Sequence, residues 1–236
     1  MTSAVVFDLD GTLADTVADI SESLDTALAT MGLPGVEPQA VRLMIGHGPV
    51  LLAQRALQYL EVSTEPHLVT HLTNAFMGHY AASGNRLSSL FPGVSDCLEE
   101  LESMNVAIGV CSNKPHDASR GLLVDLGIAK YIDALQGATA GMPKKPDPTM
   151  LLEVLRSLDT PAENALYVGD SDTDVQTARA AGLQVVLVSY GYSDRPADQL
   201  GADGVVSSLQ QLPTAWSDLK TPGPATDPRP RRLAAT

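Results

Sequence analysis

The sequence predicts an α/β fold, a doubly wound parallel sheet with a helical segment inserted into it. Short apolar runs alternate with segments of helical periodicity, as in parallel sheets whose strands are covered on both faces. Roughly ninety residues separate the first apolar run from the next, far more than a βαβ crossover needs. Two aspartates follow the first run, at the edge where open α/β sheets bind ligands.

The individual elements follow from the same patterns. Apolar runs predict strands at residues 4–7, 106–111, 165–168 and 185–188, with weaker candidates near Ala134 and at 204–206. Helical periodicity predicts helices at 94–104, 116–127, 147–158, 172–181 and 207–212. Gly127 and Gly182 stand where helices are expected to end.

The inserted segment has its own helical patterns. They cover residues 16–31, 38–45, 49–60 and 65–82, and the segment FPGV at 91–94 marks the return to the sheet. The expected organisation is therefore a discontinuous core (1–14 and 90–219), a helical domain (15–89) and a Pro-rich, basic, disordered tail (220–236).

Composition narrows the classes of function. The 236 residues carry a net charge of −13, which disfavours nucleic acid and anionic membranes as partners. An anionic phosphate ester would need a local cation or metal to bind. Neither a signal peptide nor an apolar span is evident, so we expect a cytoplasmic protein in which Cys97 and Cys111 are reduced.

Asp8 and Asp10 stand two residues apart at the end of the first expected strand, just before a turn at Gly11. The segment DLDGTL (8–13) resembles the first signature of the haloacid dehalogenase-like hydrolase superfamily in its phosphatase form. Three further motifs follow in the family's order, each after an expected strand, so the resemblance covers residues 4–182. It implies a Rossmann-like core and a mobile helical cap that closes over the active site.

We interpret Asp8 as the nucleophile, because an aspartyl-phosphate splits ester hydrolysis into two easier displacements. Asp10 is positioned by spacing to protonate the leaving oxygen and then to deprotonate water. The resemblance implies that the backbone carbonyl of Asp10 also binds the metal.

The second and third motifs supply groups for the phosphate. Ser112 can hydrogen-bond a phosphoryl oxygen, and the amide of Asn113 can do the same. Lys144 and Lys145 precede a Pro-Asp-Pro segment, and the family's Lys-Pro pattern selects Lys145 to neutralise the phosphate and Asp8.

The fourth motif, GDSDTD (169–174), is acidic. Mg²⁺ prefers oxygen ligands, and Asp8, the Asp10 carbonyl and Asp170 would supply them. Asp174 would hold a metal-bound water or orient Lys145, and Asp172 could take its place, although the family spacing favours Asp174.

The segment IGHG (45–48) and the segment YGY (190–192) resemble those of phosphoglycolate phosphatases. Gly46, His47 and Gly48 precede Pro49 at an expected helix start, where backbone N–H groups could bind a small carboxylate beside the phosphate. The expected substrate is a small phosphorylated metabolite, namely 2-phosphoglycolate, which would be hydrolysed to glycolate.

Other functions stay open at this stage. The chain could act on a sugar phosphate, a nucleotide or pyrophosphate, return the phosphoryl group to a sugar as β-phosphoglucomutase does, or be a non-catalytic binding homologue. Asp10 argues against a dehalogenase. His67 and His71 share a helix face without a third metal ligand, and either a monomer or a homodimer is compatible with the sequence.

Overall fold

The computed structural model describes residues 3–220 and 231–232, and its core is a parallel sheet. Neighbouring strands pair in parallel in the order β5-β4-β1-β6-β7-β8-β9. The strands are β1 (Ala4–Phe7), β4 (Ala107–Pro115), β5 (Ala134–Ala138), β6 (Ala165–Gly169), β7 (Gln184–Val188), β8 (Gly204–Val206) and β9 (Arg231–Arg232). The expected α/β fold with a doubly wound sheet is confirmed.

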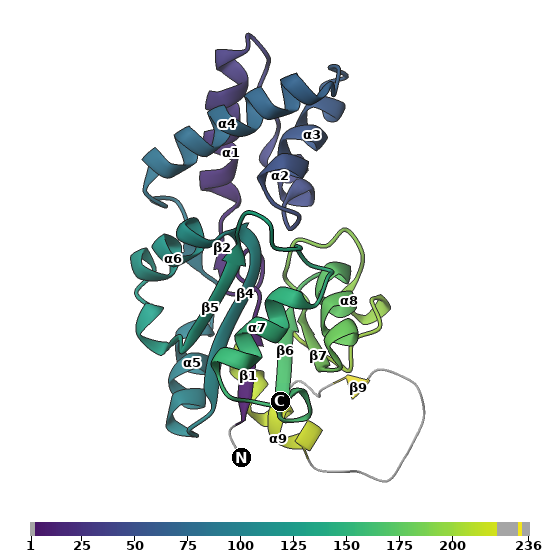
Figure 1. Cartoon of the computed structure of the whole chain (residues 1–236). Helices are drawn as coiled ribbons and strands as arrows, with labels where there is room; N and C mark the ends of the chain where they lie inside the picture. Colours follow the sequence, from purple (N-terminus) through teal and green to yellow (C-terminus); the bar gives the residue numbers. More distant parts are fainter. Residues whose placement is uncertain (1–2, 221–230, 233–236) are drawn as a thin grey trace.

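Helices cover both faces of this sheet (Figure 1). Val5 and Phe7 of β1 pack on one face with α5 (Val94–Ser103), α6 (His116–Asp125) and α9 (Leu212–Lys220). Val6 packs on the other face with α7 (Thr149–Ser157) and α8 (Asp172–Ala181). Short 3₁₀ turns are η1 (Ala129–Tyr131), η2 (Ala162–Asn164), η3 (Ala197–Gln199) and η4 (Leu209–Gln211). Since β1 is buried on both faces, the position of the residue after it, Asp8, is fixed by the core.

Strand β4 is longer than expected, because it continues from the apolar run through Pro115. Ser112, Asn113 and Lys114 therefore lie within the strand, whereas the sequence suggested that they follow it. The pairing with β5 is irregular between Ser112 and Pro115. Such an irregularity re-aims side chains next to active sites.

The C-terminal part also differs from the expectation of a helix at 207–212. A turn, η4, occupies residues 209–211, and α9 begins only at Leu212. Leu212, Ala215 and Trp216 are buried in the core, and this packing sets where the helix begins. Most of the tail expected to be disordered (220–236) lies outside the described residues, although Lys220 ends α9 and β9 pairs with β8.

Four helices form a second layer, here called the helical unit, above the carboxyl ends of the strands (Figure 1). They are α1 (Val17–Thr30), α2 (Pro38–Met44), α3 (Pro49–Tyr59) and α4 (Pro66–Ser83). Their apolar side chains form a separate core that includes Leu24, Leu57, Leu72 and Phe76. The two connections to the sheet run side by side as the antiparallel pair β2 (Ala14–Asp15) and β3 (Ser89–Leu90).

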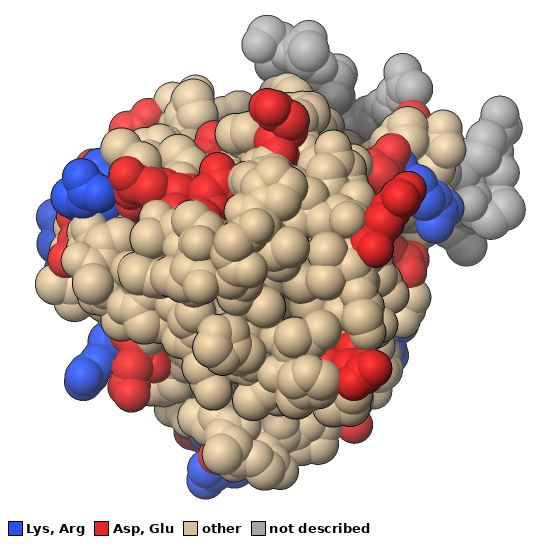
Figure 2. Space-filling view, turned by 90° about the horizontal axis from the view of Figure 1, so that it is seen from above, with Lys and Arg blue, Asp and Glu red and all other residues tan. Residues whose placement is uncertain are grey.

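The outer face of the helical unit is mostly uncharged, with scattered acidic and basic side chains around its margin (Figure 2). Asp19, near the start of α1, is fully buried and ties this unit to the returning chain. Its carboxylate accepts hydrogen bonds from Leu87 N–H and from the hydroxyl of Ser88 at 2.6 Å. Among the described residues, no helix is both long enough and apolar enough to cross a membrane.

Candidate active site

The residues expected to carry chemistry meet at the carboxyl ends of β1, β4 and β6. Asp8 follows β1, and its N–H donates to Val168 O of β6 at 2.8 Å. Asp170 follows β6, and Lys145 comes from the loop before α7. Asp8, Lys145 and Asp170 are all buried, which places their charges where electrostatic interactions are strong.

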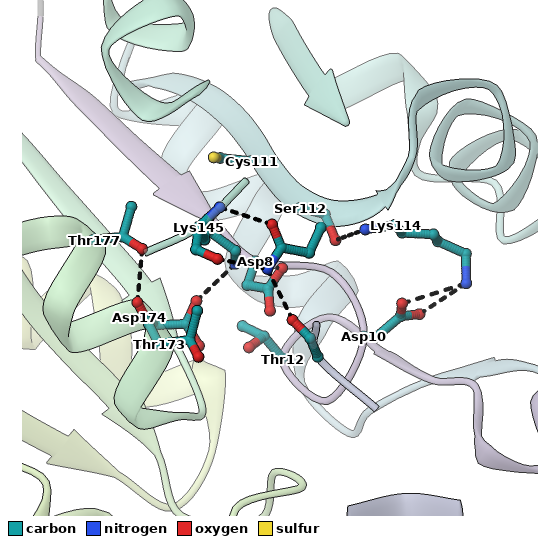
Figure 3. A network of polar contacts seen from close by, with 12 residues as sticks. Asp8, Asp10, Thr12, Cys111, Ser112, Lys114, Lys145, Thr173, Asp174 and Thr177 are labelled. Carbon is teal, nitrogen blue, oxygen red and sulfur yellow. Dashed lines mark hydrogen bonds and ion pairs between the residues drawn. The ribbon is translucent and has the colours of Figure 1, made fainter. Parts of the chain in front are cut away.

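The Lys145 ammonium joins two of the carboxylates. Its Nζ lies 2.9 Å from Asp8 Oδ1 and 2.7 Å from Asp174 Oδ1 (Figure 3). It also donates to the Tyr167 hydroxyl at 2.9 Å. Burial alone would lower the pKa of Lys145, but Asp174 and Asp8 raise it. Lys145 therefore stays charged and neutralises part of the negative charge of the site.

Asp174 has a positioning role in this arrangement. Its Oδ2 accepts hydrogen bonds from the N–H groups of Asp170 and Ser171 at 3.1 Å and from the Ser171 hydroxyl at 2.7 Å. Its Oδ1 accepts from Lys145 and from Tyr167. Both oxygens are thus engaged, and although burial raises its pKa, Lys145 and the Ser171 hydroxyl lower it overall.

Asp172, the alternative to Asp174, lies elsewhere. It is exposed on α8, and its carboxylate accepts a hydrogen bond from Gln176 on the same helix. Asp174 is the member of this acidic motif that contacts Lys145.

Oxygens of Asp8, Asp170 and Asp174 lie within 4.8 Å of one another. Asp8 Oδ1 is buried, and Lys145 Nζ lies 2.9 Å from it. Burial raises the pKa of Asp8 to about 6, although Lys145 opposes the rise. Burial and the neighbouring carboxylates also raise the pKa of Asp170. Clustered oxygen donors with excess negative charge fit a hard cation.

Asp170 is held in place from three sides. The Tyr192 N–H donates to its Oδ2 at 2.6 Å, and the Thr12 hydroxyl lies 3.4 Å from its Oδ1. Gly191 packs directly on it, since a Cβ at this position would lie 2.1 Å from Asp170 Cβ. The YGY segment that the sequence analysis singled out therefore supports a carboxylate of the site.

Asp10 lies on the side of Asp8 away from Lys145 and forms an ion pair with a different lysine, Lys114. Lys114 Nζ is 3.1 Å and 3.3 Å from the two Asp10 oxygens (Figure 3). The Thr16 hydroxyl donates to Asp10 Oδ1 at 2.8 Å. Burial would lower the pKa of Lys114, but Asp10 and then Tyr80 raise it. In this structure Asp10 is therefore ion-paired with Lys114.

A pocket opens beside Asp8 and Asp10. The sheet contributes Ser112 and Lys114 to its wall. The helical unit contributes mostly apolar residues, among them Ile20, Leu52, Phe76, Met77 and Tyr80. The pocket therefore lies between the two layers of the molecule, with the expected nucleophile on its wall.

Asn113 has a different environment from the one expected. Its Nδ2 donates to Gly46 O at 3.0 Å and to Lys145 O at 3.1 Å, while its Oδ1 accepts from Lys145 N–H at 2.8 Å. The side-chain amide is thus occupied in holding the Lys145 loop and the helical unit. Any contact of Asn113 with a phosphoryl oxygen would have to come from its backbone N–H.

The three residues expected to bind a substrate carboxylate, Gly46, His47 and Gly48, do not all face the same pocket. Gly46 and Gly48 line the pocket, and a Cβ on Gly48 would lie 2.8 Å from Lys144 Nζ. His47 instead faces α8, where its Nε2 lies 3.3 Å from the Thr173 hydroxyl. Burial and Arg55 lower the pKa of His47. His47 borders a neighbouring cavity that Asp10 and Asp170 also line.

The remaining candidates lie apart from this site. His67 is exposed and contacts Glu65, and His116 accepts from Gly137 N–H. Cys97 and Cys111 are buried free thiols, and burial raises the pKa of both to about 12. Neither thiol is suited to nucleophilic attack near neutral pH.

Two residues that sequence reasoning did not single out belong to the site. Tyr167 lies inside β6 and donates to Cys111 O at 3.1 Å while it contacts Lys145 and Asp174. Lys114 directly follows the Ser112-Asn113 pair, so a lysine in a strand that ends at the site was its only sequence signal.

Known proteins resemble this chain in sequence and in fold. A family model described as haloacid dehalogenase-like hydrolase matches residues 5–188. The chain belongs to this family. A phosphoglycolate phosphatase from Rhodospirillum rubrum is 38% identical over 227 residues, which cover 94% of each chain. A plasmid-encoded phosphoglycolate phosphatase from Cupriavidus necator is 38% identical over 213 residues, covering 89% of this chain and 91% of the relative.

Solved structures show the same fold. The crystal structure of a predicted phosphoglycolate phosphatase from Haemophilus somnus superposes with a TM-score of 0.84 at 27% identity, covering 91% of this chain and 97% of that one. The expected membership of the family is confirmed.

Proposed function

We propose that this protein is a Mg²⁺-dependent phosphatase that hydrolyses 2-phosphoglycolate to glycolate through an aspartyl-phosphate on Asp8. The observation that carries the proposal is the position of Asp8, which lies on the wall of the pocket with Lys145 at 2.9 Å and Asp10 two residues on. The names of the relatives from Rhodospirillum rubrum and Cupriavidus necator support the choice of substrate.

In the first step, a carboxylate oxygen of Asp8 attacks phosphorus and the bond to the ester oxygen breaks. Lys145 offsets the charge of Asp8 and of the incoming phosphate. Asp10 must first leave Lys114 and take up a proton from solvent. It then gives this proton to the leaving glycolate oxygen, and the resulting carboxylate removes a proton from the water that hydrolyses the acyl phosphate. Ser112, buried on the pocket wall, donates a hydrogen bond to a phosphoryl oxygen.

Asp8, Asp170 and the Asp10 carbonyl would hold Mg²⁺, with Asp174 fixing Lys145. Bound there, Mg²⁺ would supply positive charge to the phosphoryl oxygens. The three clustered, buried carboxylates and the raised pKa of Asp170 support a cation at this place. A cation held there would also relieve the repulsion between the buried carboxylates.

We also propose that the helical unit, residues 15–89, acts as the cap of the site. Its apolar side chains form one wall of the pocket, which supports the exclusion of water during phosphoryl transfer. Hydrogen bonds link the unit to the sheet domain. Among them, Arg42 donates to the carbonyls of Tyr190 and Gly191, and Asn113 donates to Gly46 O.

The buried thiols support a reducing, cytoplasmic location.

The test is phosphate release from 2-phosphoglycolate, sugar phosphates, nucleotides and pyrophosphate, measured with Mg²⁺ and with EDTA. The expected result is metal-dependent release with preference for 2-phosphoglycolate, and its loss in Asp8→Asn. Preference for another ester would discard the substrate but keep the chemistry. A sugar bisphosphate intermediate without net phosphate release would indicate a mutase instead.

A further inference from the structure

Lys114 is a buried cation for which the proposed reaction has no direct use. It stands near the end of β4, is 7% exposed, and points its ammonium at Asp10. The metal and phosphate region is served by a different lysine, Lys145, which reaches Asp8 from the other side (Figure 3). Lys114 is thus a second buried lysine beside the two aspartates, and it can meet a second anionic group of the substrate.

The side chains that line the pocket limit which anionic group of a substrate can bind there. Among the residues that line it in the described chain, Lys114 is the sole cationic side chain. The wall opposite consists mostly of apolar side chains of the helical unit, such as Phe76 and Met77. An anion that enters beside the phosphate ester therefore has one cation to meet and little room to extend beyond it.

Tyr80 supplies the second, independent observation. Its ring lies over the Lys114 ammonium, 4.5 Å from Nζ to the ring centroid, and its side chain lines the same pocket. The residue is 6% exposed, and apart from the neighbouring Lys114 ammonium its hydroxyl has no hydrogen-bond partner among the described residues. A buried hydroxyl without a partner costs stability unless a ligand satisfies it.

We propose that Lys114 and Tyr80 bind the carboxylate of the substrate and thereby set the specificity for a phosphorylated hydroxy acid. This inference rests on the proposed phosphatase function. A carboxylate accepts hydrogen bonds at both oxygens, so the ammonium of Lys114 and the hydroxyl of Tyr80 can each donate to it.

The carboxylate would also replace Asp10 as the partner of Lys114. In the present arrangement Asp10 is bound by Lys114 through both oxygens. Binding of the substrate carboxylate would release Asp10 to face the ester oxygen that it must protonate. Because Tyr80 belongs to α4, the same contact would draw the helical unit onto the bound substrate.

The test compares two isosteric esters, 2-phosphoglycolate and its neutral amide, 2-phosphoglycolamide, at saturating Mg²⁺. The quantity measured is the ratio of their kcat/KM values. Lys114→Met is expected to lower this ratio about 10- to 100-fold and Tyr80→Phe about 10-fold, the loss of one or two charge-assisted hydrogen bonds. Tyr59→Phe, which alters an exposed tyrosine at the end of α3, is expected to leave the ratio unchanged.

The outcomes are distinct. If Lys114→Met and Tyr80→Phe reduce kcat/KM for both esters equally, Lys114 only orients Asp10 and the carboxylate site is overturned. Tyr80→Phe keeps the ring and carries the test if Lys114→Met does not fold. If the unaltered protein releases phosphate from neither ester, the proposed function and this inference both fail.

Discussion

Lys145 lies closer to Asp174 than to the expected nucleophile, with its Nζ 2.7 Å from Asp174 Oδ1 and 2.9 Å from Asp8 Oδ1. Asp174 is in turn held by the start of α8, through Ser171 and the N–H of Asp170. The position of the lysine is therefore set by a helix N-terminus that also carries Asp170. One local structure orients the cation and the proposed metal ligand together.

Replacing Lys145 tests this shared position. In Lys145→Met two buried carboxylates lose their cation, so we expect the free energy of unfolding to fall by about 3–5 kcal/mol. Phosphate release is expected to fall at least about 10²-fold, because the transition-state charge is no longer offset. Urea unfolding and steady-state kinetics measure the two effects. Lys144→Met, a change at the half-buried neighbour, is the matched control, and equal losses in both variants would contradict the role of Lys145.

Tyr167 is expected to act by positioning Lys145. Tyr167→Phe removes the hydroxyl that contacts Lys145, Asp174 and Cys111 O, which should cost about 1 kcal/mol of stability. We expect kcat to fall about 10-fold with little change in KM, corresponding to about 1.4 kcal/mol in the barrier. Tyr131→Phe removes a hydroxyl bonded to Glu99 away from the site and serves as control. An unchanged kcat in Tyr167→Phe would show that Lys145 needs no such support.

The pKa of Asp8, raised to about 6 by burial against the opposing effect of Lys145, predicts how Mg²⁺ affinity depends on pH. Below pH 6 the carboxyl group carries a proton that the metal must displace, whereas above it the group is already ionised. The apparent affinity should therefore fall as the pH drops below 6, by about 10-fold per pH unit from the protonation of Asp8. Isothermal titration calorimetry between pH 5 and pH 8, in two buffers of different ionisation enthalpy, measures affinity and proton release. A flat affinity from pH 5 to pH 7 would contradict the expectation.

Gly191 is expected to be required for the position of Asp170. A Cβ at Gly191 would lie 2.1 Å from Asp170 Cβ and 2.5 Å from its Oδ2, so Gly191→Ala must displace that carboxylate. We expect Mg²⁺ affinity to fall about 10-fold or more, the effect typical of disturbing the support of a metal ligand. Gly121→Ala, in α6 with open space around it, is the control and should be neutral or slightly stabilising. Equal Mg²⁺ affinity in both variants would show that the YGY segment can move aside without displacing the Asp170 carboxylate.

A large part of the fold follows from the sequence because strand order and helix periodicity are local. The run Ala4–Phe7 appears as β1 and the helix at 172–181 as α8, each with the expected bounds. Gly182 ends α8 in the left-handed conformation (φ 76°), as expected of a glycine at a helix terminus. The start of α9 was missed, because burial of Leu212 and Trp216 against α5 and the sheet depends on distant parts of the chain.

The sequence by itself determined the family and the residues that meet at the edge of the sheet, since Asp8, Lys145 and Asp170 each occupy a motif tied to the end of a strand. Only the tertiary structure decided their partners: Asn113 binds backbone carbonyls, His47 faces Thr173, and Lys114 pairs with Asp10 beneath Tyr80. The physical reason is that hydrogen bonds and ion pairs between distant segments depend on distance and orientation, which the packing of the helical unit on the sheet sets. Spacing along a chain specifies the face of an element, not the side chain that comes to lie opposite it.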